Sequence, residues 1–163
     1  MFSPDILSLA EAVVATSRRS GLMVATAESC TGGLVAGAIT AVPGSSEALE
    51  RGFVTYSNAA KATMLGVAPD LIEAHGAVSE PVARAMAQGA VAMSAADVAV
   101  AVTGVAGPGG GSDEKPVGLV HFAATGPQGT IHQARRFGDI GRDAVRAASV
   151  RVALEMLLER LGA

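Results

Sequence analysis

Hydrophobic residues along the chain alternate between helical spacing and short continuous runs, which predicts an α/β protein. Apolar residues between 6 and 14 recur at intervals of three and four, and the tripeptide SPD at 3–5 is typical of a helix start. Residues 22–27 form a continuous apolar run of strand length, as in a strand covered on both faces. The clearest strand is DVAVAVT at 97–103.

The other predicted elements continue this alternation. We expect helices over 31–41, 58–65, 69–74, 79–93 and 142–161, a strand over 52–55 that begins as early as 49, a glycine-rich loop over 104–116, and a hairpin of 117–125 and 130–137. Such an order predicts a three-layer α/β/α sandwich, whose mixed, mostly parallel, five-stranded sheet has one antiparallel strand near an edge. No linker or repeat divides the chain, so we expect one domain over residues 1–163.

Composition excludes several classes of function. Aromatic residues make up 3% of the chain, the net charge is −3, and the 12 Lys and Arg residues are dispersed, so we expect no nucleic-acid binding. No apolar run reaches the roughly 18 residues of a membrane span, and no basic segment resembling a signal peptide opens the chain. A single cysteine fits a reducing compartment, and we expect a cytoplasmic protein.

Polar residues cluster directly after three predicted strands. These clusters are Glu28-Ser29-Cys30-Thr31, then 55–58 followed by Lys61, and then 103–111. In an open α/β sheet, ligands bind beyond the carboxyl ends of the strands. The three clusters are therefore expected to meet in one site.

The first cluster allows two interpretations. Ser29 or Thr31 is an ordinary helix cap, or the turn exposes a hydroxyl at a helix N-terminus, where backbone N–H groups stabilise negative charge. Cys30 competes as a nucleophile, although a lone cysteine is more often a small buried hydrophobe.

A serine nucleophile needs a base. His75 is expected to end a short helix, His121 to lie in the core, and His132 to face solvent on the hairpin. Lys61 is the better candidate, because it lies one turn into a helix and a buried lysine can lose its proton. Tyr56, the only tyrosine, sits at a strand end where its phenol could relay a proton.

The glycine-rich segment TGVAGPGGGSDEK at 103–115 can form an anion-binding nest. Its spacing matches neither a P-loop nor a dinucleotide fingerprint, so it suits one phosphate or carboxylate; the alternative is a flexible loop. No His, Cys, Asp and Glu set has metal-ligand spacing, so we expect no metal and no cofactor.

Four motifs in this order (TAESCTGG, GFVTYSNAAK, AHGAVSE and TGVAGPGGGSDEKPVG) resemble the CinA C-terminal domain family, in its stand-alone amidohydrolase form. The resemblance extends from about Leu9 to Leu161 and implies an anticodon-binding-domain-like α/β/α fold. It also implies hydrolysis of nicotinamide mononucleotide to nicotinate mononucleotide and ammonia, a step of pyridine nucleotide salvage, and association into a homo-oligomer. The small-residue face of Gly89 and Ala90 would fit a subunit contact or internal packing equally well.

Carried onto matching positions, the resemblance makes Ser29 the nucleophile and Lys61 its base, with Tyr56 and Thr103 assisting. We expect oxyanion and substrate contacts from neighbouring residues of the three clusters: Glu28, Cys30, Thr31, Gly32, Gly33, Asn58, Gly104, Gly107, Gly109 and Gly110. Two alternatives use the same cleft. One is a non-catalytic nucleotide-binding regulator, and the other is a Ser/Lys amidase of different specificity.

Overall fold

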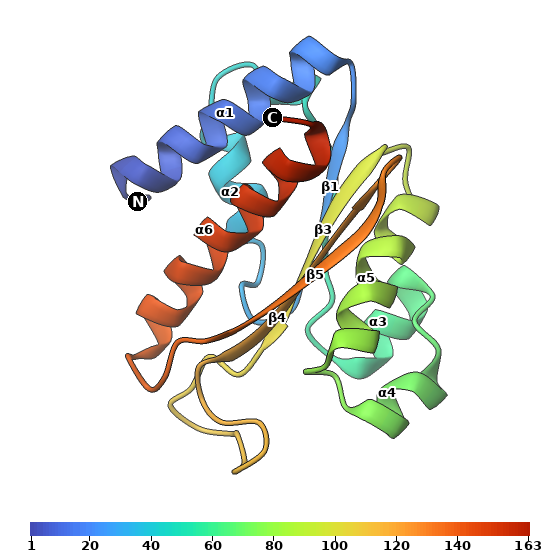
Figure 1. Ribbon diagram of the computed structural model, residues 1–163, viewed down its shortest axis with the longest axis vertical. Helices are drawn as coiled ribbons and strands as arrows, with labels where there is room; N and C mark the ends of the chain where they lie inside the picture. The colour runs from blue at the N-terminus through green and yellow to red at the C-terminus, as the bar shows by residue number, and fades with distance from the viewer.

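A five-stranded sheet runs through the middle of the protein, with helices on both of its faces (Figure 1). The computed structural model describes residues 1–163. The strands are β1 (Val24–Glu28), β2 (Leu49–Val54), β3 (Val98–Gly104), β4 (Leu119–Gly126) and β5 (Gly129–Arg136). The helices are α1 (Pro4–Ser20), α2 (Leu34–Thr40), α3 (Asn58–Leu65), α4 (Pro69–His75), α5 (Glu80–Ala92) and α6 (Arg142–Leu161), with a 3-10 turn, η1, at Ser45–Glu47.

The order of strands in the sheet is β2-β1-β3-β4-β5. Strands β1, β2 and β3 are parallel, β4 runs antiparallel to both of its neighbours, and β5 forms the edge. This confirms the predicted mixed sheet with one antiparallel strand near an edge. Both crossovers among the parallel strands bring their carboxyl ends to the same side of the molecule.

The two faces of the sheet carry side chains of different size. Mostly valines and Phe122 face the layer of α1, α2 and α6, whereas mostly alanines, with Phe53, face the layer of α3, α4 and α5. The small side chains let α5 lie close to β3 and β4, and α5 itself packs tightly against α3. A Cβ atom at Gly89 would lie 2.0 Å from the carbonyl oxygen of Leu65, so internal packing accounts for this glycine.

Several predicted boundaries shift by a few residues. Helix α2 begins at Leu34 instead of residue 31, because Gly32 (φ +57°) and Gly33 (φ +103°) adopt left-handed conformations that end the preceding turn. Strand β4 begins at Leu119, directly after Gly118, whose added Cβ would lie 2.2 Å from the carbonyl oxygen of Gly138. The predicted bounds of α3 and α6 are correct. None of the helices has the length and apolar character needed to cross a bilayer.

Candidate active site

The segments that follow β1, β2 and β3 lie side by side at one edge of the sheet. The backbone N–H of Ser29 donates to the carbonyl of Val102 at 2.9 Å, and the N–H of Thr55 donates to the carbonyl of Glu28 at 2.9 Å. These two bonds extend the strand pairing beyond β1, so they hold the first polar cluster against the end of β3 and against the start of the second cluster.

Ser29 and Lys61 are in direct contact across 32 positions of sequence. The side-chain nitrogen Nζ of Lys61 lies 3.1 Å from Oγ of Ser29 and 2.9 Å from the carbonyl oxygen of Thr55. The carbonyl oxygen of Tyr56 lies 3.4 Å from the same nitrogen. Ser57 places the lysine here, because its hydroxyl accepts from the N–H of Ala60 and starts α3 one turn before Lys61.

The environment of Lys61 favours a neutral amine. The side chain is 1% exposed, and burial lowers the pKa of its amine below the ordinary value for lysine. No carboxylate forms an ion pair with it. A neutral amine has two N–H donors and one lone pair, which match two carbonyls and one hydroxyl proton. The geometry therefore suits Lys61 as the acceptor of the Ser29 proton.

Glu28 holds the first turn of α2. Its carboxylate is fully buried, and its two oxygens accept from the backbone N–H groups of Val35 at 2.8 Å and Ala36 at 3.0 Å. The predicted cap by Ser29 or Thr31 is therefore wrong, because the preceding glutamate satisfies these amides from inside the core. With both oxygens bound to backbone amides, Glu28 positions the turn that carries Ser29.

Two backbone amides beside Ser29 have no protein acceptor. The N–H of Gly32 donates to the carbonyl of Ser29 at 3.0 Å, whereas those of Cys30 and Thr31 make no hydrogen bond. Of the residues expected to contact an oxyanion, Cys30 and Thr31 thus have free backbone N–H donors, whereas the N–H of Gly32 is already bonded. Burial raises the pKa of the Cys30 thiol to about 11, so this side chain stays protonated and does not compete as a nucleophile.

Tyr56 extends away from the lysine. Its side chain is 61% exposed, and its phenol oxygen accepts from Nη2 of Arg142 at 3.0 Å. The other terminal nitrogen of Arg142 donates to the carbonyl of Gly107 at 2.8 Å. One guanidinium therefore joins the second cluster to the glycine-rich loop, and the phenol forms no hydrogen bond to Ser29 or Lys61.

A second arginine of α6 supports the turn after Ser29. Arg146 donates from Nε to the carbonyl of Cys30 at 3.1 Å and from Nη2 to that of Thr31 at 3.2 Å. Sequence analysis missed both arginines of α6, because they lie far along the chain from the residues they contact. The only signal is their spacing of four, which puts Arg142 and Arg146 on one face of the helix.

The remaining predicted site residues make contacts other than to Ser29 and Lys61. Thr103 is buried, and its hydroxyl donates to the carbonyl of Ala77 at 2.9 Å, so it anchors the segment before α5. Asn58, at the first turn of α3, lines a separate cavity of about 390 Å³ beside α4. Gly109 and Gly110 form no hydrogen bond to the residues around Ser29, and Gly104 ends β3 against β4.

The histidines differ from their predicted positions. His121 is only partly buried instead of lying in the core, and His132 is turned inward with a 13% exposed side chain. Their rings meet on the α5 face of the sheet, where Nδ1 of His121 lies 2.9 Å from Nε2 of His132. His75 does end α4, as predicted. No group of three or more His, Cys, Asp and Glu side chains is placed to hold a metal ion.

Comparison with known proteins places this chain in a family. The family model described as the CinA C-terminal domain matches residues 6–161. The chain belongs to this family. A CinA-like protein of Parasynechococcus marenigrum is 54% identical over 155 residues, covering 94% of this chain and 37% of that protein. The chain thus spans little more than a third of such relatives.

Other members of the family match along their whole length. The protein named nicotinamide-nucleotide amidohydrolase PncC of Escherichia coli K12 is 48% identical over 160 residues, covering 98% of this chain and 97% of that protein. The crystal structure of the competence/damage-inducible protein CihA from Agrobacterium tumefaciens is 54% identical, with a TM-score of 0.97 over 100% of this chain and 99% of that one. The mixed α/β fold is therefore that of the CinA family.

Proposed function

We propose that this protein hydrolyses the carboxamide of nicotinamide mononucleotide, giving nicotinate mononucleotide and ammonia. The observation that supports the proposal most strongly is the contact of a buried lysine amine with a serine hydroxyl at the carboxyl edge of the sheet. A full-length relative that is 48% identical bears the name of such an amidohydrolase.

In the proposed first step, Oγ of Ser29 attacks the carboxamide carbon while Nζ of Lys61 takes the hydroxyl proton. The carbonyl oxygen becomes an oxyanion that accepts from the N–H groups of Cys30 and Thr31. Removing one donor of this kind typically costs about 2.7–4 kcal/mol of transition-state stabilisation. Protonated Lys61 then gives its proton to the departing nitrogen, and ammonia leaves.

In the second step, water attacks the ester formed on Ser29. Lys61 takes a proton from the water and returns it to Oγ as the ester bond breaks, which releases the carboxylate product and restores the enzyme. The carbonyls of Thr55 and Tyr56 hold the amine in place throughout, because they accept its two remaining N–H groups. All bonds and protons balance without a metal or redox group.

We assign the 5′-phosphate to the surface between Arg142 and the glycine-rich loop. Arg142 bridges Tyr56 and Gly107, and a guanidinium is suited to bidentate contact with phosphate. Arg146 would act indirectly, by holding the carbonyls beside the two free amides. Thr103, Gly104, Gly109 and Gly110 would shape the loop around the nucleotide.

The proposal is tested by measuring ammonia release from nicotinamide mononucleotide, free nicotinamide, glutamine and a peptide amide. We expect turnover of the mononucleotide alone. Binding of the mononucleotide without ammonia release would instead support a non-catalytic regulator, and turnover of the other amides would support an amidase of different specificity. Either result would contradict the proposal.

A further inference from the structure

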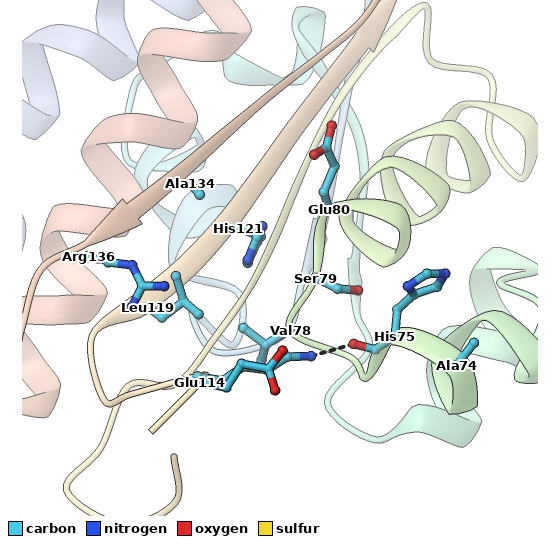
Figure 2. A pocket seen from close by; sticks show the side chains of 11 residues that line it. Ala74, His75, Val78, Ser79, Glu80, Glu114, Leu119, His121, Ala134 and Arg136 are labelled. Atoms are coloured by element: carbon cyan, nitrogen blue, oxygen red, sulfur yellow. Dashed lines mark hydrogen bonds between the residues drawn. The ribbon is translucent and has the colours of Figure 1, made fainter. Parts of the chain in front are cut away.

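A second cleft, of about 440 Å³, opens on the α5 face of the sheet (Figure 2). It lies between the end of α4, the start of α5, the tip of the glycine-rich loop and the hairpin of β4 and β5. Its volume is in the range of small-molecule sites. None of Ser29, Lys61, Tyr56 and Arg142 lines it, so it is distinct from the site described above.

Two positively charged side chains and one imidazole line this cleft, each from a different segment of the chain. The side chain of Arg136, at the end of β5, forms no hydrogen bond or ion pair with the protein. Lys115 donates only to the carbonyl of His75, which leaves the rest of its ammonium free. His121 lines the same cleft from β4 (Figure 2). The cleft thus holds a guanidinium, an ammonium and an imidazole without a bound anion partner from the protein.

A chain of polar groups lies behind His121. Its Nδ1 lies 2.9 Å from Nε2 of His132, whose Nδ1 lies 3.7 Å from the carboxylate of Glu80. A proton on Nδ1 of His132, attracted by Glu80, makes Nε2 of that ring an acceptor. Nδ1 of His121 is then the donor, and its Nε2 is the atom left to take up a proton.

Negative charge around the cleft is limited to two glutamates. Glu80 is paired with Arg84 at 3.0 Å and with His132, so little of its charge is left for the cleft. Glu114 is exposed on the loop tip, lines the cleft and forms no ion pair. Its negative charge opposes anion binding. Removing that charge should therefore tighten binding, whereas removing a positive charge from the cleft should weaken it.

We propose that this cleft binds a small phosphate monoester, with its phosphoryl group held by Arg136, Lys115 and His121. The cleft is larger than a phosphate group, and Val78 and Leu119 supply apolar surface for an organic part such as a pentose. A guanidinium and an ammonium from separate segments, together with an imidazole that takes up a proton when the anion binds, select a dianion over a neutral sugar.

Binding is coupled to protonation of the histidines. Burial is the main cause that lowers the pKa of both His121 and His132. The nearby His132, Lys115 and Arg136 lower the pKa of His121 further, whereas Glu80 raises it. A bound dianion adds an opposite charge beside His121 and raises its pKa. The complex therefore takes up a proton, and affinity increases as pH falls.

The test is an NMR titration of the histidine ring signals with D-ribose 5-phosphate, inorganic sulfate and free ribose. We expect saturable shifts of the His121 and His132 signals with the first two ligands and none with ribose. Arg136→Ala should weaken binding about 10-fold, as expected for loss of a charged contact at close range, and Glu114→Gln should tighten it about 2-fold. Arg142→Ala, in the candidate active site, should leave these shifts unchanged.

Sulfate stays a dianion between pH 6 and pH 8, so any change in its affinity over this range comes from protonation of groups on the protein. We expect wild type to bind sulfate about 5-fold more tightly at pH 6 than at pH 8, and His121→Gln to lose most of this difference. Absence of saturable shifts at pH 6 would overturn the proposal. So would shifts that disappear in Arg142→Ala and persist in Arg136→Ala, since the ligand would then occupy the other site.

Discussion

The carboxylate of Glu28 offers the sharpest test of how the candidate site is held together. Replacing Glu28 with Gln keeps the shape of the side chain but exchanges one oxygen for an NH2 group. Both oxygens now accept from backbone N–H groups, those of Val35 and Ala36. The variant therefore sets one donor against another inside a fully buried region.

The magnitude follows from the two bonds. A hydrogen bond to a charged group contributes about 1.5–3 kcal/mol, and a buried amide left without an acceptor costs about 1–3 kcal/mol. We expect Glu28→Gln to lower the free energy of unfolding by about 3 kcal/mol. For a protein of this size, that corresponds to a decrease in Tm of roughly 6–12 °C.

Urea denaturation followed by circular dichroism measures this difference directly, with Glu11→Gln as the control. Glu11 is exposed on α1 and forms no ion pair, so its variant should unfold within about 0.5 kcal/mol of wild type. A loss below about 1 kcal/mol in Glu28→Gln would refute the inference that this carboxylate holds the first turn of α2.

Three further predictions concern packing, charge and pH. Gly89→Ala should destabilise the protein by about 1–3 kcal/mol in urea unfolding, because its Cβ would meet the Leu65 carbonyl at 2.0 Å; a neutral effect would contradict the α3–α5 packing. Arg142→Ala should raise KM for the mononucleotide about 10-fold while the Tm stays close to that of wild type, since its contact to Tyr56 is exposed and its contact to the loop is only partly buried; an unchanged KM would argue against the phosphate assignment. Steady-state kcat/KM of wild type should rise with pH and level off below the ordinary lysine pKa of about 10.4, because the neutral amine of Lys61 is the active form and burial lowers its pKa. Lys61→Arg should lose this rise together with about 10²–10⁴-fold of activity, and a variant that kept both would exclude Lys61 as the base.

Local sequence signals predicted the sheet and most of the helices. The alternation of apolar runs with helical spacing is set by neighbouring residues, as is the Ser57 cap that starts α3 and so places Lys61. The convergence of three strand ends follows from parallel topology, which the crossover helices imply. For these reasons the proximity of Ser29 and Lys61 could be inferred before the fold was known.

Such local signals could not predict contacts between segments that lie far apart in the sequence. Nothing in the residues near Glu28 shows that its carboxylate turns back to accept from two amides of α2. The position of Arg142 against Tyr56 depends on how α6 packs across the sheet. His121 was misplaced because the cleft beside it keeps its ring partly exposed, and His132 was misplaced because its ring turns inward to meet that of His121.

Ammonia release by Ser29→Ala tests the central claim most directly. We expect the variant to keep the circular dichroism spectrum of wild type and to bind nicotinamide mononucleotide, because Ser29 is partly exposed and its hydroxyl bonds only to Lys61. Turnover of the mononucleotide should fall at least about 10³-fold. A folded Ser29→Ala protein that releases ammonia at the wild-type rate would contradict the account.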